Sequence, residues 1–169
     1  MTAAARKLET SDSCESDTDA WLVGTNINPN TLLATDYLHY FNEVVIMIEM
    51  LPDMPDCRED VVAWRPKTYQ QHFADSMFSE KELAIEAYYF APSTLRNHFE
   101  TVVQQADWLL ELSVKRLVTA MDAGDDELLR MVANRASRDL KRLVEVAGAI
   151  IIGSTSAINQ AEIDDMFAN

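Results

Sequence analysis

The chain has 169 residues, enough for one folded domain with tails, and 48% of them are apolar, enough to bury a core. The 28 acidic residues outnumber the 14 Lys and Arg, and the resulting net charge of −14 argues against nucleic acid and anionic membranes as partners. Four Gly and five Pro are too few for the many tight turns of a β-rich protein. Two Cys without metal-binding or redox spacing, and the lack of an apolar leader or membrane span, predict a soluble cytoplasmic protein.

An acidic arm is expected at the start of the chain, over residues 1–30. The stretch from Glu9 to Asp19 is polar and acidic, and such a composition is typical of disordered segments. Trp21, Leu22 and Val23 are apolar and could anchor the end of the arm.

Short helices are expected in the next region, residues 31–91. Apolar residues recur at helical spacing from Thr31 to Leu51, and Pro52 ends this first helix. Three more short helices are predicted, over 60–64, 66–75 and up to residue 90.

Two local sequence signals indicate where these short helices start. Pro66 is expected in the first turn of its helix, where its missing N–H costs nothing. Ser79 and Glu82 have the spacing of a capping box, which would begin the helix that ends at Phe90.

The strongest pattern is a pair of long helices, predicted over 93–121 and 125–152. The connection 122–125 is so short that helices of about 40 Å must lie antiparallel. The sequence therefore predicts an all-α protein: a helical bundle domain over 31–153, built on a long antiparallel two-helix hairpin, with short helices before it and a C-terminal peptide helix after it. The hairpin's apolar stripe is larger than one partner helix covers, which also predicts a homodimer.

The basic residues of this region gather on the hairpin. They are Lys115, Arg116, Arg130, Arg135, Arg138, Lys141 and Arg142. One interpretation is a solvated face with ion pairs at i,i+4 to Asp139 and Glu145. The other is a surface for an acidic partner, a role that the protein's own acidic arm could also fill.

The tail, residues 154–169, has the pattern of a docking peptide. Ile163, Met166 and Phe167 fall at i, i+3 and i+4, so a helix here would carry one apolar stripe. Acidic residues fill the positions between, and Ser154 to Ser156 separate the segment from the preceding helix. A short acidic amphipathic helix on a polar tether suits a groove with a basic rim.

The string Gln160-Ala161-Glu162-Ile163-Asp164 resembles the N-terminal segment of the flagellar switch protein FliM. It is similar, more loosely, to the C-terminal segment of the phosphatase CheZ. In both families this peptide binds the phosphorylated response regulator CheY. The resemblance covers only residues 159–169. It implies a chemotaxis or flagellar signalling protein that binds a CheY-like response regulator through Gln160, Glu162, Ile163, Asp164, Asp165, Met166 and Phe167. The alternative is an all-α interaction or structural protein unrelated to motility, with its tail packed on its own bundle.

The resemblance to CheZ also suggests candidate catalytic residues. That family has an acid and a Gln four residues apart on a long helical hairpin, and Glu100 and Gln104 have this spacing. The amide would orient a water for attack on an aspartyl phosphate, and the acid would engage the regulator's own site. The family has Asp where Glu100 stands, and the surrounding residues differ. Both could also be ordinary surface residues of a helix.

Histidines give weaker alternatives. Asp36, His39 and Glu43 share one helix face, and His72 lies on another helix, but no complete metal-binding motif is present. No metal or cofactor is therefore predicted, although the sequence leaves a site at these residues open. His98 lies early on a long helix but lacks the acidic neighbour of a phosphoacceptor histidine. It is expected to be an ordinary surface residue.

Overall fold

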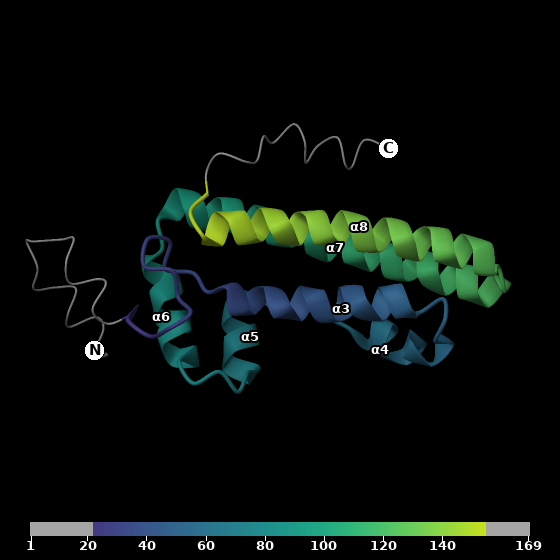
Figure 1. The fold of residues 1–169 in the computed structure, drawn as a ribbon, viewed down its shortest axis with the longest axis horizontal. Coiled ribbons are helices and arrows are strands. Elements are labelled where there is room, and N and C mark those ends of the chain that lie inside the picture. Colours follow the sequence, from purple (N-terminus) through teal and green to yellow (C-terminus); the bar gives the residue numbers. More distant parts are fainter. Residues whose placement is uncertain (1–21, 155–169) are drawn as a thin grey trace, which may run out of the picture.

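The computed structural model describes residues 22–154, and Figure 1 shows its ribbon. This part contains six α-helices, two short 3-10 helices and no β-strand beyond one isolated bridge between Ile27 and Ala34. The predicted all-α class is therefore confirmed. Within residues 22–154, none of the helices combines the length and the apolar character needed to cross a lipid bilayer.

Two long helices, α7 (Ser93–Ala123) and α8 (Asp126–Ile151), lie side by side along the molecule (Figure 1). Gly124 joins them in the left-handed region at a φ of 65°, which a residue without a Cβ adopts at low cost. The side chain of Asp125 accepts the Leu128 N–H at 2.9 Å and caps the start of α8.

Helix α3 (His39–Met50) lies along α8 and follows the 3-10 helix η1 (Thr35–Leu38). Within one chain it covers part of the apolar face of α8, and the predicted homodimer stays a prediction. Val44, Val45 and Ile48 of α3 are buried in this contact region of the core.

The predicted start of this helix at Thr31 is wrong. The Asn28 carboxamide oxygen accepts the N–H groups of Asn30 and Thr31, which forms a turn, and Leu32 follows at a φ of 60°. A left-handed residue cannot continue a helix. The helical backbone therefore begins at Thr35, four residues after the predicted start.

The short helices are η2 (Pro55–Cys57), α4 (Arg58–Ala63), α5 (Tyr69–Asp75) and α6 (Lys81–Phe90). Pro66 lies before α5 and not in its first turn, because Thr68 and Gln71 form a capping box that fixes the start at Tyr69. The capping box predicted at Ser79 and Glu82 is also wrong. Helix α6 has Glu80 at its N-cap position and no side-chain cap, and the Lys81 N–H is instead bonded to the Phe78 carbonyl in the preceding turn.

The folded part begins earlier than the expected boundary at residue 31. Leu22 and Ile27 are buried, with 4% and 3% of their surface exposed. The core thus includes residues that composition assigned to the acidic arm. Residues 1–21 lie outside the described part of the chain.

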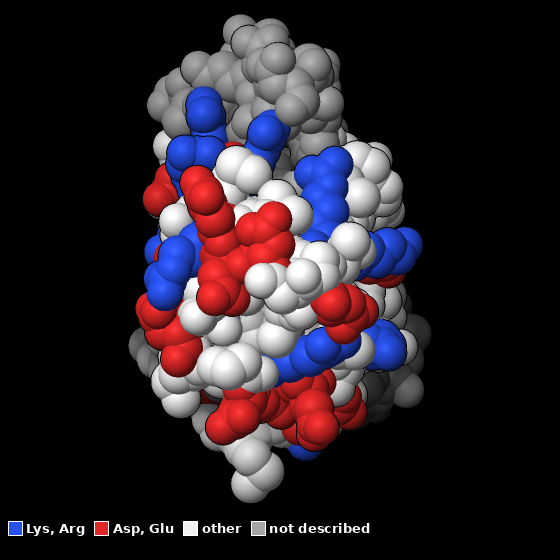
Figure 2. All heavy atoms as spheres, turned by 90° about the vertical axis from the view of Figure 1, so that its right-hand side faces the viewer, with Lys and Arg blue, Asp and Glu red and all other residues white. Residues whose placement is uncertain are grey.

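The end of the molecule at which α7 turns into α8 carries charges of both signs. Figure 2 shows acidic and basic side chains interspersed on this end. Two ion pairs link the α7–α8 hairpin to the segment after α3. Arg58 lies 2.7 Å from Asp122, and Arg130 lies 2.6 Å from Asp53. All four side chains are well exposed, so each pair contributes at most about 1 kcal/mol.

Candidate functional site

The two residues predicted as catalytic line one surface hollow of about 300 Å³. Glu100 and Gln104 face it from α7, together with Asp107 one turn further on. The opposite wall is the segment that leads into α5, and the other lining residues are Tyr37, Pro66, Lys67, Thr68, Tyr69, Gln70, Gln71, Tyr88, Phe99 and Val103.

Glu100 is engaged inside its own chain. Its carboxylate accepts a hydrogen bond from the Tyr88 hydroxyl of α6. Gln104 is exposed and free to meet a solvent molecule or a partner. Sequence spacing therefore placed the pair on one face of α7, but it did not show that a tyrosine holds the acid.

Aromatic rings form a continuous wall of this hollow. Tyr69 stacks on Tyr88 with ring centroids 4.7 Å apart and meets Phe99 edge-on at 6.0 Å. Phe99 in turn lies edge-on to Tyr37 at 5.7 Å. Such pairs add about 0.5–1.5 kcal/mol each beyond the area they bury. Burial also raises the pKa of these three tyrosines above the ordinary value, so their hydroxyls stay protonated.

The tyrosine hydroxyls are occupied by bonds within the protein. Tyr37 donates to the Lys67 carbonyl at 2.8 Å, and the Tyr69 hydroxyl oxygen accepts the Ala34 N–H at 2.9 Å. These hydroxyls therefore have partners within the protein, and the rings themselves are almost fully buried, with 0–6% of each residue exposed.

Asp107 is the residue that sequence reasoning missed. Its Oδ1 atom is buried and has no hydrogen-bond partner. Burial and, to a smaller extent, the neighbouring Glu111 carboxylate together raise the pKa of this carboxyl from 3.8 to about 7. The sequence showed only that Glu111 stands four positions away, whereas the burial of Asp107 is set by the folded structure.

The histidine cluster considered for a metal is packed with aromatic rings. The His72 ring lies edge-on to Tyr37 at 5.5 Å and to Phe73 at 5.2 Å. Burial lowers the pKa of His72, with Glu43 and Asp36 close enough to act in the opposite direction. Among residues 22–154, no group of three or more His, Cys, Asp or Glu side chains is placed to hold a metal ion. His98 is exposed.

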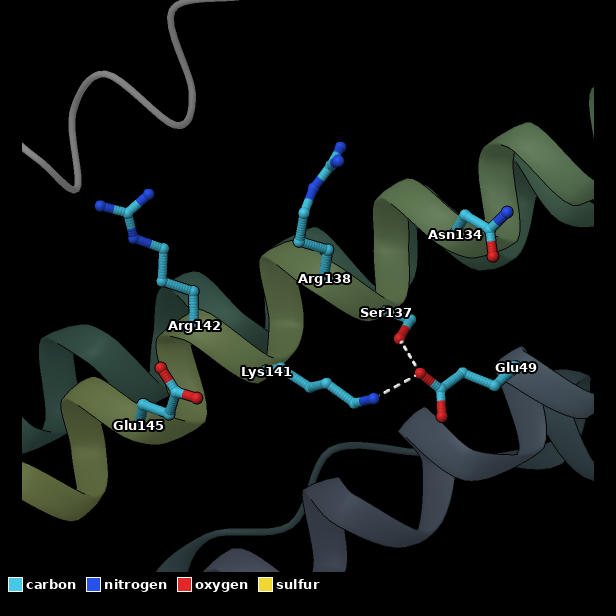
Figure 3. Close-up of a pocket in the computed structure, with 7 residues that line it drawn as sticks. All are labelled: Glu49, Asn134, Ser137, Arg138, Lys141, Arg142 and Glu145. Carbon is cyan, nitrogen blue, oxygen red and sulfur yellow. Dashed lines mark hydrogen bonds and ion pairs between the residues drawn. The ribbon is translucent and has the colours of Figure 1, made fainter.

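A second, open hollow of about 490 Å³ lies on α8 and is shown in Figure 3. Lys141 and Ser137 both donate to Glu49 of α3, each at 2.5 Å, which fastens α8 to α3. Arg138 and Arg142 point away from α3 on the other side of this contact (Figure 3).

Part of the basic face is paired as a solvated helix face would be. Arg135 and Asp139 form an ion pair at i,i+4 at 3.6 Å, and Arg138 lies 3.7 Å from the same carboxylate. The α8 hollow therefore has mixed charge.

The tail residues predicted to bind a partner, from Gln160 to Phe167, lie outside the described residues. Comparisons with protein-family models, with curated proteins and with solved structures find no match for this chain. The described part of the chain is thus an all-α protein with a hollow lined by Glu100, Gln104 and Asp107.

Proposed function

We propose that the protein is a chemotaxis or flagellar signalling protein that binds a CheY-like response regulator through its tail, residues 158–168. The observation that carries the proposal is the tail's own residue pattern. Ile163, Met166 and Phe167 supply an apolar stripe, and Glu162, Asp164 and Asp165 supply charge for a basic rim.

The way α8 ends shows that this helix stops ahead of the tail. Gly153 has a φ of 77°, and the Ser154 N–H donates to the Ala149 carbonyl at 2.9 Å. This bonding, with a left-handed glycine at the helix end, is a Schellman-type termination. The core helix therefore stops before the tail begins, and the tail is not a direct extension of α8.

Removing the tail tests this function. We expect the full chain, but not a chain lacking residues 157–169, to retain a response regulator carrying an aspartyl-phosphate mimic on an affinity column. If the tail is not part of the bundle, the melting temperature should stay the same. A shortened chain that melts early and still retains the regulator would support the alternative, an interaction or structural protein whose tail packs on its own bundle.

Dephosphorylation of the bound regulator would be an additional role. Gln104 supports it, because this exposed amide lies in the same hollow as Glu100. The Tyr88 bond to Glu100 is an obstacle, since the acid must leave its tyrosine to engage a partner's site.

Gln104→Ala tests that role. If the protein accelerates dephosphorylation, the substitution should return the reaction to the regulator's own rate while binding is unchanged, because the amide acts only on the water. Thr101→Ala, an exposed change one turn earlier on α7, is the matched control. Unchanged turnover in the Gln104 variant would remove this residue from the mechanism.

A further inference from the structure

We propose that the outer face of α8 binds residues 9–19, the acidic segment that precedes the described part of the same chain. The receiving surface is an arginine stripe, which consists of Arg135, Arg138 and Arg142. These residues are three and four positions apart on one helix, so their side chains leave α8 on the same side. The proposal does not depend on the tail or on any response regulator.

The bases beside the arginine stripe are held by other parts of the bundle. Lys141 lies 2.5 Å from the Glu49 carboxylate of α3, and Arg130 lies 2.6 Å from Asp53 in the segment after α3. Contacts this short are charge-assisted hydrogen bonds, the strong class of hydrogen bond. These two bases therefore fasten α8 to its neighbours, and we expect a further acidic segment to bind at the arginine stripe instead.

Arg138, in the middle of the stripe, is exposed and only loosely paired. Its side chain is 75% exposed, and it lies 3.7 Å from the Asp139 carboxylate, which Arg135 also approaches at 3.6 Å. A strong charge-assisted hydrogen bond is shorter, at about 2.7–2.9 Å. Because a guanidinium has several N–H donors, Arg138 can bind a second carboxylate. Figure 3 shows Arg138 and Arg142 directed away from α3, on the side where a segment of chain can approach them.

Residues 9–19 complement the arginine stripe in charge. They contain no Lys or Arg, and a carboxylate recurs at every second or third position: Glu9, Asp12, Glu15, Asp17 and Asp19. Carboxylates bind guanidinium groups through charge-assisted hydrogen bonds that can be bidentate. In a chain of net charge −14, the segment with the densest negative charge would thus lie against a basic face, where repulsion from the other acids is smallest.

The arginine stripe suits this acidic segment better than it suits the amphipathic tail. Between residues 135 and 142 the exposed side chains of α8 are all basic. The large exposed apolar residues that the structure describes on and just after α8, Met131 and Ile152, lie outside this range. The tail carries an apolar stripe, which needs an apolar groove to bury it. A segment of carboxylates and small polar side chains needs no such groove.

The chain between residues 9–19 and the folded core is long enough to reach the arginine stripe. Leu22 is buried, and Figure 1 shows the described chain starting at the same end of the molecule at which α8 ends. Arg135 lies about 24 Å along the helix axis from Ile151, the last residue of α8. The residues from Glu9 to Leu22 can span up to about 43 Å when extended. A tether this short gives an effective concentration on the order of millimolar, so weak ion pairs are enough for binding.

The test uses a nitroxide spin label on Cys14, which lies within residues 9–19, in a full-length Cys57→Ser protein where it is the remaining thiol. At low salt the label should broaden the backbone NMR signals of residues 135–142 and leave those of α4 sharp. At 1 M salt this broadening should fall about threefold or more, because the Debye length drops from about 10 Å at 0.1 M to about 3 Å.

Two sets of substitutions separate binding at the stripe from chance proximity. Arg138→Glu with Arg142→Glu should lower the broadening about threefold or more, since exposed ion pairs are individually weak but two are reversed. Arg65→Glu with Lys67→Glu, between α4 and α5, changes the net charge equally and should lower it much less. A neutral-arm protein, in which the five acidic residues of the segment 9–19 are replaced by Asn or Gln, should lose the broadening as the stripe variant does.

Several results would overturn the proposal: no broadening of residues 135–142 at low salt, broadening that persists at 1 M salt, or broadening that persists in the neutral-arm protein. The first of these would make the arginine stripe a solvated face. The salt series and the neutral-arm protein leave the bundle unsubstituted, so the proposal is tested even if the stripe variant fails to fold. A chain lacking residues 157–169 should show the same broadening as the full chain. If its deletion instead shifts the signals of residues 135–142 while the label leaves them sharp, the tail is the occupant and the proposal is wrong.

Discussion

A protein carrying both Ile163→Ala and Phe167→Ala is expected to lose affinity for a phosphorylated response regulator by about 30-fold or more. Two apolar anchors buried in a groove typically contribute about 1–3 kcal/mol each, so their joint loss spans about 2–6 kcal/mol. If the tail is a docking peptide and not part of the bundle, the melting temperature should not change. Isothermal titration of the regulator, with a thermal melt of each variant, measures both quantities.

The charged residues of the tail provide the matched control. Glu162→Gln should leave the dissociation rate nearly unchanged and lower the association rate, because rim charges act mainly on encounter. The effect should fade in high salt, since the Debye length falls to about 3 Å at 1 M. If the double alanine variant instead melts several degrees lower and binds as before, the tail is part of the bundle and the docking proposal fails.

Asp107→Asn is expected to stabilise the protein at pH 8 and to lose most of this advantage as the pH falls to 5. The carboxyl has a pKa of about 7 in the folded protein against 3.8 ordinarily, so folding disfavours its charged form. Above pH 7 the group is ionised in both states and its buried charge lowers the free energy of unfolding. As the pH falls from 7 toward 4, the folded protein takes up a proton that the unfolded chain does not, and this cost disappears.

The size of the effect follows from the same shift, reduced for solvent. A rise of about three pH units corresponds to about 4 kcal/mol, but the side chain is only partly buried and water screens its charge. We expect a gain of about 1–2 kcal/mol at pH 8, or about 3–8 °C in melting temperature. Calorimetry at pH 5, 6, 7 and 8 measures it, and Glu111→Gln should show a smaller gain with the same pH trend. Equal destabilisation of the Asn variant at every pH would show that the carboxyl is not held at a cost.

A carboxylate kept at a cost in stability is a common mark of a functional position. Asp107, which lines the hollow beside Glu100 and Gln104, is therefore a candidate functional residue.

The parts of the fold set by local chemistry were open to prediction from sequence. The turn at residues 122–125 contains Gly124 and Asp125, one suited to a left-handed position and the other to a helix cap, and both take these roles. The predicted helix starts were wrong where two local signals compete. Thr31 begins an apolar pattern of helical spacing, but Asn28 forms a turn over it, and Thr68 takes the cap that Pro66 had suggested.

The site was only partly visible in the sequence for a similar reason. The spacing of Glu100 and Gln104 on one helix was enough to put them on one face. That Tyr88 bonds Glu100, and that Asp107 is desolvated, both depend on which other elements pack against α7. Residues far apart in sequence decide these contacts, and no local pattern encodes them.

The hydrogen bond from the Thr31 hydroxyl to the Ile151 carbonyl has a consequence for folding kinetics. It joins residues 120 positions apart, at 2.5 Å, and the Thr31 side chain also contacts the region of Gly153. The α7–α8 pair needs only a two-residue turn to close, whereas this contact must wait for nearly the whole described chain to be in place. Loop-closure entropy therefore orders the steps: the hairpin forms early, and the segment from Thr31 into α3 docks late. During synthesis on the ribosome, α3 has no surface of α8 to cover until the end of the domain has emerged, so its apolar face is exposed for most of translation.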